Sequence, residues 1–249
     1  MLAAGHAASP STLLKGLDSP DALAIARDNI NVAGVTNITL MAGDALDLRA
    51  AADYVLVEKS SGGEGPGTDL GERLCNGGFD VAHTHQVMLH VQDPARLMRE
   101  LRGAVKKRGG VVCCRDAELG SMIVHPNSEV LSRFCSIIPS IMSNHGADPE
   151  VGRKHLEYAL KAGFKRSEVE ISMGQMLASA QEERKSLAEP FLGGSLQQVD
   201  VTGPNTAFVR AGLKPDAVYE VLRAWREWVE IEYGWCFIAN AQVVCRRSD

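Results

Sequence analysis

The chain has 249 residues, 45% hydrophobic and 23% charged, with a formal net charge of −5; this fits one elaborated α/β domain of ordinary composition. Because nucleic-acid binding depends on clustered cations, and no run of Lys or Arg is interleaved with aromatic residues, the composition argues against a DNA or RNA partner. No apolar run approaches the roughly 20 residues of a membrane-spanning helix, and residues 1–14 lack the features of a secretory signal, so a cytoplasmic protein without membrane attachment is predicted.

The N-terminal segment is predicted to alternate strands and helices. Residues 13–18 are typical of a short strand that ends in an acidic residue. Ser19 and Pro20 then suit the N-cap and the first position of a helix, which Gly34 ends. A second strand is predicted at residues 35–42.

Residues 49–78 have no regular hydrophobic pattern. They include the glycine-rich run 60–67, which is too flexible for a packed element, and a possible short strand at 54–58. This segment is therefore predicted to be a surface loop.

A second strand–helix–strand unit is predicted after this loop. Residues 79–85 indicate a third strand, and Asp93 with Pro94 begins a helix whose apolar residues recur at helical spacing. Gly109 precedes a further strand at 111–115. The repeated strand–helix–strand order predicts a parallel sheet with covering helices.

The second half of the chain is predicted to be mainly helical. The expected elements are helices at 130–143, 149–162 and 215–230 and strands at 169–176 and 235–246. We therefore expect a single domain over 1–249, with a cofactor-binding half at 1–125, a helical cap with one strand at 126–230, and a terminal strand at 231–249.

A nucleoside bound to an open parallel sheet needs polar groups at the carboxyl ends of the strands. Asp18, at the end of the first predicted strand, is the candidate for the ribose hydroxyls, although it could be an ordinary helix-start acid. The turn after the next strand is the candidate for the adenine side, and the residues after the third strand are candidates for the part of the ligand beyond the nucleoside. These candidates are Gly43, Asp44, Ala45, His85 and Gln86.

The block from residue 79 to residue 116 resembles the fourth strand and the following helix of class I S-adenosylmethionine-dependent methyltransferases of the ubiquinone/menaquinone-biosynthesis type, and the match continues to the end of the block. It begins Phe79-Asp80-Val81-Ala82-His83-Thr84-His85 and ends with Arg115-Asp116. Residues 224–228, 234–235 and 243–246 are similar to a subgroup that methylates secondary metabolites, near the gliotoxin-type thiol methyltransferases. The three tryptophans in this region are also read as core residues.

The resemblance implies a Rossmann-like sheet with flanking helices, a helical cap insertion and an antiparallel last strand. It implies S-adenosylmethionine as the methyl donor and a small-molecule acceptor. The family's first strand and its glycine-rich turn have no counterpart ahead of residue 16, so we expect this strand to be missing and the chain to be N-terminally truncated or divergent. The spacing of Gly63, Gly65 and Gly67 fits such a turn, but the run follows the adenine motif and is interpreted as a loop.

Other site residues are predicted from their side-chain chemistry. His85 or His90 could deprotonate an acceptor, because imidazole groups titrate near neutral pH. Arg115 and Asp116 are candidates for substrate binding, or else solvate a loop. His83 and His85 share a strand face, but no further ligands stand at useful spacing, so no metal is expected.

The six cysteines form no C-x-x-C pair and are expected to be reduced.

Two other classes of function remain open. A nicotinamide-dependent reductase would need a G-x-G-x-x-G turn at the start of a helix, which the sequence lacks. The absent glycine-rich turn favours instead a catalytically silent methyltransferase-like protein or a truncated gene product as the main alternative.

Overall fold

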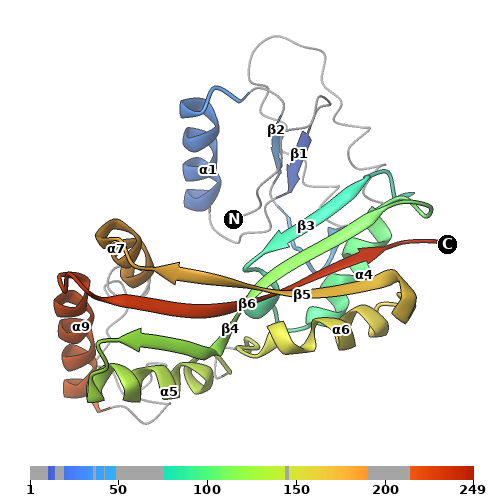
Figure 1. Ribbon diagram of the computed structural model, residues 1–249. Coiled ribbons are helices and arrows are strands. Elements are labelled where there is room, and N and C mark those ends of the chain that lie inside the picture. Colours follow the sequence, from blue (N-terminus) through green and yellow to red (C-terminus); the bar gives the residue numbers. More distant parts are fainter. Residues whose placement is uncertain are drawn as a thin grey trace. The chain divides into compact units, whose positions relative to one another are not determined.

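The computed structural model describes residues 11–14, 20–35, 38–41, 43–48, 76–143, 146–189 and 214–249. The chain contains both helices and strands (Figure 1). In chain order they are β1 (Ser11–Leu14), α1 (Pro20–Val32), β2 (Ile38–Met41), β3 (Val81–His85), the 3-10 helix η2 (Met88–His90), α4 (Pro94–Ala104), β4 (Val111–His125), α5 (Glu129–Ser143), α6 (Val151–Lys161), the 3-10 helix η3 (Arg166–Glu168), β5 (Val169–Ala178), α7 (Gln181–Glu189), α9 (Pro215–Val229) and β6 (Trp235–Arg246).

The chain divides into two compact units that are each built from segments distant in sequence. Unit 1 comprises Met1–Arg115, His155–Ile171 and Val243–Asp249. Unit 2 comprises Asp116–Lys154 and Ser172–Gln242. The unit boundaries fall inside β4, β5, β6 and α6, so these elements contribute residues to both units.

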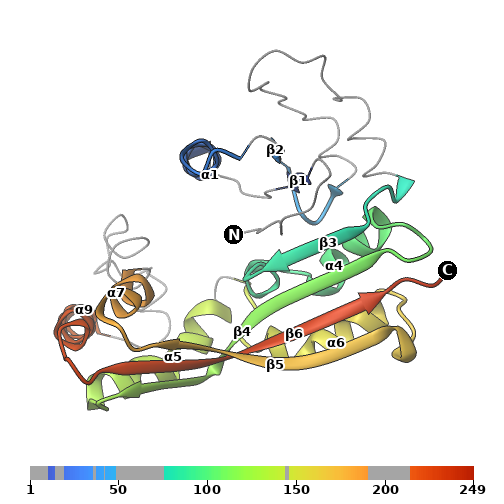
Figure 2. The same ribbon diagram turned by 45° about the horizontal axis from the view of Figure 1, so that its top comes forward.

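The strands form two sheets. β1 and β2 pair in parallel, and the remaining strands form a four-stranded sheet of order β3-β4-β6-β5. β3 is parallel to β4, with Val81 opposite Val111. β6 runs opposite to β4 and β5, as Figure 2 shows, and the pairs Glu170–Arg246 and Ser172–Gln242 follow the same reversed order. The predicted mixed α/β class and the antiparallel last strand are confirmed.

Helix α4 begins and ends as its sequence predicts. The Asp93 side chain accepts a hydrogen bond from Arg96 N at 2.8 Å, and Pro94 occupies the first helical position. The apolar residues of the helix lie on one buried face, namely Leu97, Met98, Leu101 and Ala104. Burial of each Leu or Met side chain contributes about 1.5–3 kcal/mol, so this face fixes the helix within unit 1.

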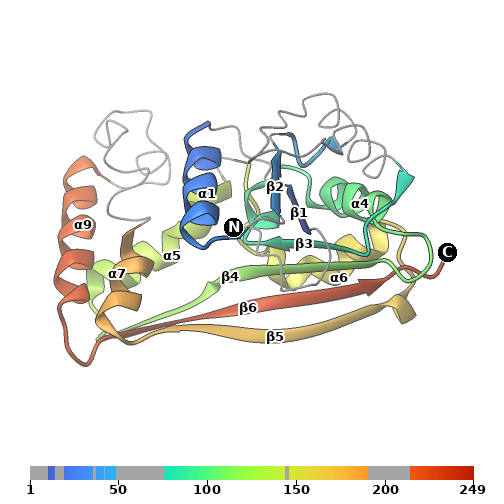
Figure 3. The ribbon, with the colours of Figure 1, turned by 90° about the horizontal axis from the view of Figure 1, so that it is seen from above.

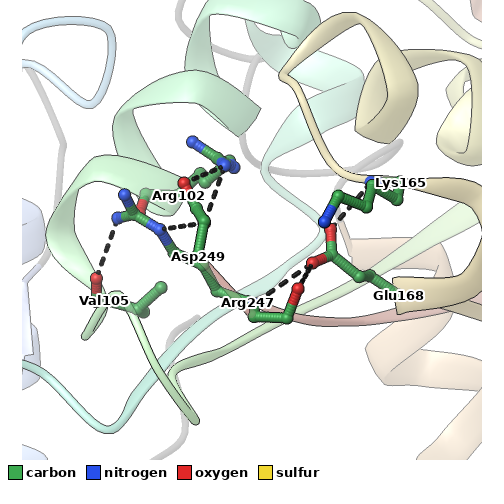
Figure 4. A network of polar contacts seen from close by, with 7 residues as sticks. Arg102, Val105, Lys165, Glu168, Arg247 and Asp249 are labelled. Atoms are coloured by element: carbon green, nitrogen blue, oxygen red, sulfur yellow. Dashed lines mark hydrogen bonds and ion pairs between the residues drawn. The ribbon is translucent and has the colours of Figure 1, made fainter.

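The last residues of the chain hold unit 1 together by polar contacts (Figure 4). Arg247, only 9% exposed, donates to the carbonyl oxygens of Arg102 and Val105 at 2.9 and 3.2 Å. Asp249 accepts from Arg247 Nε and from the Arg102 guanidinium, each at 2.9 Å. The C-terminal segment is thereby attached to the end of α4.

The same segment is also attached to the start of β5. Glu168, in η3, accepts from Ser248 N at 3.1 Å and from Lys165 N at 2.7 Å. Three sequence-distant parts of unit 1 therefore meet at residues 247–249: the end of α4, η3 and the end of β6.

Unit 2 has its core between the strands and helices α5 and α9. Trp225 and Trp228 are 0% and 1% exposed, and their rings meet edge to face at 5.3 Å. Phe134 of α5 meets Trp225 at 6.1 Å in the same geometry, which is favourable for aromatic pairs. Figure 3 shows α5, α7 and α9 gathered where β5 ends and β6 begins.

Several predicted elements differ from the structure. The strand predicted at residues 13–18 is β1, at Ser11–Leu14. The strand predicted at 111–115 continues to His125, so Asp116 lies inside β4 instead of in a following loop. Helix α7 is not among the predicted helices; it begins where Glu183 accepts from the backbone N–H groups of Ser179 and Ala180, each at 2.9 Å. The loop predicted at 49–78, apart from its last three residues, lies outside the described residues, as do the glycine-rich run 60–67 and Asp18.

Candidate functional site

The candidate site is built on the segments that follow β2 and β3. Asp44 comes three residues after β2, and its Oδ1 accepts from Leu46 N at 2.8 Å. Asp47 N donates to the Asp44 carbonyl at 3.1 Å, which closes the turn. The turn holds the Asp44 carboxylate at an exposed position beyond the end of β2, where sheet proteins of this class bind ligands.

This turn is attached to helix α4. Leu48 is 3% exposed, and its N–H donates to Glu100 Oε2 at 3.1 Å. An ion pair of 3.7 Å joins Asp47 to Arg96. Helix α4 also contacts β3 and η2. The Asp44 turn and the segment that contains the second group of candidates are therefore attached to the same helix of unit 1.

The second group follows β3, where the backbone takes an unusual conformation. His85 is the last residue of β3 and lies in register with Arg115 of β4. Gln86 has φ +57°, and its N–H donates to the Arg115 carbonyl at 2.8 Å. The left-handed region costs a residue with a side chain about 1–2 kcal/mol. Such strain persists mostly where the surroundings hold it, and it is frequent at functional sites.

The next residues anchor this turn in the interior. Met88 and Leu89 of η2 are 0% and 4% exposed, while His90 is exposed and donates its N–H to Val87 O at 3.0 Å. The two candidate bases therefore differ in setting: His85 is half-buried at the strand end, whereas His90 faces solvent.

The candidate substrate residues lie inside β4. Arg115 is half-buried, and Asp116 is fully buried. Glu118, two residues further along the strand, is 7% exposed. Glu118 accepts from Arg153 N at 3.2 Å and forms an ion pair with the Arg153 guanidinium, which raises the pKa of Arg153. Glu118 therefore caps the start of α6, and its partner Arg153 belongs to the same unit.

Sequence reasoning missed two of these features. Nothing in the sequence marks Gln86 as left-handed, because Gly and Asn are the usual residues there. The capping role of Glu118 depends on Arg153, 35 residues away.

Among the described residues, no group of three or more His, Cys, Asp or Glu side chains is arranged to hold a metal ion. No helix within the described ranges combines the length and the apolar character needed to cross a membrane.

The whole chain can be compared with known proteins by sequence and by fold. No family model matches it. The chain is 29% identical over 171 residues to an uncharacterized methyltransferase of Schizosaccharomyces pombe, C1B3.06c; the match covers 69% of this chain and 59% of the relative.

Among solved structures, the chain is similar to phosphoethanolamine N-methyltransferase 2 of Haemonchus contortus, solved with phosphomonomethylethanolamine and S-adenosylhomocysteine. That likeness has 16% identity and a TM-score of 0.40, covering 91% of this chain and 41% of that one. A putative methyltransferase of Bacillus halodurans matches at 12% identity and a TM-score of 0.45, with 96% and 84% of the two chains covered. The chain thus spans well under two thirds of the curated relative and of the first of these structures.

Proposed function

We propose that this protein transfers a methyl group from S-adenosylmethionine to a small-molecule acceptor. The observation that carries the proposal is the 171-residue match to a protein named as a methyltransferase, because it extends over 69% of the chain. The strand–helix–strand unit from β3 to β4 supports it, since the carboxyl end of a parallel strand pair is where such sheets bind nucleosides.

Asp44 and its neighbours are proposed to bind the adenosine part of the donor, with Gly43 and Ala45 letting the ligand approach the backbone. The exposed carboxylate, oriented by Leu46 N, suits the hydroxyl and amino groups of a nucleoside. Asp18 is proposed for the ribose. His85 and Gln86 are proposed to contact the methionine part.

The bound donor supplies a methyl group activated by a positively charged sulfur. The protein's own task is to hold donor and acceptor at reacting distance and to keep water away. We propose His85 or His90 as the base for an acceptor that still carries its proton. Arg115 and Asp116 are proposed to contact the acceptor; because Asp116 is fully buried, Arg115 is the more accessible of the two.

The acceptor is proposed to be a secondary metabolite. Support for this comes from the resemblance of residues 224–228 and 234–235 to enzymes of that kind. Trp225 and Trp228 lie in the core of unit 2, so we propose that their side chains stabilise α9 and do not contact the acceptor.

Calorimetric titration with S-adenosylhomocysteine, the product of the donor, tests the proposal. The wild type should bind, and Asp44→Ala should weaken binding at least about tenfold, the equivalent of about 1.4 kcal/mol. Asp47→Ala is the matched control, because it removes the same side chain from the same turn but leaves the Asp44 carboxylate in place. Equal affinity of Asp44→Ala and wild type would remove Asp44 from the site.

A silent methyltransferase-like protein predicts a different outcome. Ligand that binds the folded state must raise its apparent stability. Absence of any thermal shift with S-adenosylmethionine or S-adenosylhomocysteine, at concentrations up to millimolar, would contradict methyl transfer and favour the silent protein.

A further inference from the structure

Strand β5 is an edge strand with an exposed apolar surface. It lies at one end of the order β3-β4-β6-β5, so within the described part of the chain one of its two backbone edges is paired with β6 and the other with no strand. Four large apolar side chains are exposed along it: Ile171 (41%), Met173 (62%), Met176 (36%) and Leu177 (48%). Exposed apolar residues scattered singly need no explanation, but four within seven residues of one edge strand do.

This edge lacks the features that prevent strands from pairing with one another. Folded proteins usually protect an exposed edge with lysine, proline or a bulge. Residues 171–181 contain no charged residue and no proline. The flanking acids Glu170 and Glu182 stand at or beyond the ends of this stretch, and Glu170 forms an ion pair with Arg246.

We propose that β5 pairs with β5 of a second copy of this chain, forming a continuous antiparallel sheet across a two-fold axis at Gln175. In this register, the residue numbers of any two opposite residues add up to 350. Met173 of one copy is then opposite Leu177 of the other, and Gly174 is opposite Met176.

The sequence of the strand is complementary to itself in this register. Opposite residues lie on the same face of the sheet. Met173, the most exposed methionine of the strand, is therefore placed against the exposed Leu177 of the other copy, and the two-fold axis repeats this pair. On the other face, Met176 lies opposite a residue without a side chain. No charge of one copy faces a charge of the other between residues 171 and 179.

Mass measurement by analytical ultracentrifugation over a concentration series tests the association. The wild type should have twice the chain mass of 26.8 kDa. Met173→Lys should raise the dissociation constant of the dimer at least tenfold, because the new charge lies at the centre of the interface. Ile123→Lys, on β4 and 53% exposed, is the matched control and should remain dimeric. A monomeric wild type, or a Met173→Lys variant that dimerises like wild type, overturns the proposal.

Cysteine cross-linking tests the register. Opposite Cα atoms on antiparallel strands are about 4.5–5.5 Å apart, which suits a disulfide. Gln175→Cys should therefore form a covalent dimer by exchange with oxidised glutathione, which is reduced to two molecules of glutathione. Met173→Cys should not, because position 173 of one copy is about 13 Å along the strands from position 173 of the other. Wild type, with its native cysteines, gives the background, and cross-linking of Met173→Cys in preference to Gln175→Cys refutes the register.

Discussion

Arg184 of α7 is predicted to be a main stabilising residue of unit 2. Its side chain is 3% exposed. Its Nε donates to Val229 O at 3.2 Å, and a terminal nitrogen donates to Gly234 O at 3.1 Å and to Ser179 O. The three carbonyls belong to the end of α9, the turn before β6 and the start of α7, so one guanidinium joins three segments.

The effect of removing it can be worked out from these bonds. A hydrogen bond from a charged donor contributes about 1.5–3 kcal/mol, so three give about 4.5–9 kcal/mol gross. Burying the guanidinium costs several kcal/mol. We therefore expect Arg184→Met, which keeps the apolar stem, to lower the free energy of unfolding by about 2–4 kcal/mol. Arg184→Lys keeps the charge but not the planar arrangement of donors, and should lose about half as much.

Urea unfolding followed by tryptophan fluorescence measures this loss, because Trp225, Trp228 and Trp235 all lie in unit 2. With a denaturant slope of about 2 kcal/mol/M, Arg184→Met should lower the midpoint by about 1–2 M. Lys185→Ala is the control, since its exposed ion pair with Glu182 is of a kind worth about 0–1 kcal/mol. The reasoning is refuted if Arg184→Met and Lys185→Ala unfold at the same urea concentration.

Three further outcomes are expected. Trp225→Ala should lower the free energy of unfolding by about 3–5 kcal/mol in the same urea assay, since it empties a fully buried site; a loss under 1 kcal/mol would contradict the packing described for α5 and α9. Hydrogen bonds from Arg247 and then Arg102 lower the pKa of Asp249 to about 2. The stability that Asp249 adds is therefore present above about pH 4 and is lost as the pH falls towards 2. The difference in urea midpoint between wild type and Asp249→Asn should shrink over that range, and a difference that grows would refute this prediction. Burial raises the pKa of Cys236 and Cys245 to about 12. At pH 8 both thiols should therefore react with an aromatic disulfide reagent only on unfolding, as peptide mass mapping would show. Fast labelling of these two cysteines in the native protein would contradict the prediction.

The sequence predicted elements well where local signals were strong. The N-cap Asp93 with Pro94 placed the start of α4, and Gly34, at φ +64°, follows the end of α1 as expected. The apolar pattern of residues 235–246 matched β6 along its whole length. In each case the signal lies within a few residues of the element itself.

Features that depend on distant partners could not be predicted in this way. Asp116 and Glu118 resemble residues of a loop, and only the contact of Glu118 with Arg153 shows why this part of β4 is buried. Helix α7 is highly charged, and Arg184 is held by carbonyls about 50 residues away. At the candidate site, the sequence placed Asp44 and His85 after strands, but the contact between Leu48 and Glu100 was not predictable from local pattern.

The C-terminal contacts of Arg247 and Asp249 also constrain when unit 1 can fold. Unit 1 combines residues up to Arg115 with Val243–Asp249, and unit 2 lies between them in sequence. During synthesis, α4 therefore lacks its contacts with Arg247 and Asp249 until residues 243–249 have left the ribosome. Long sequence separation between contacting residues slows folding, so unit 1 should become protease-resistant only after residues 243–249 have left the ribosome, by which point all of unit 2 has left it.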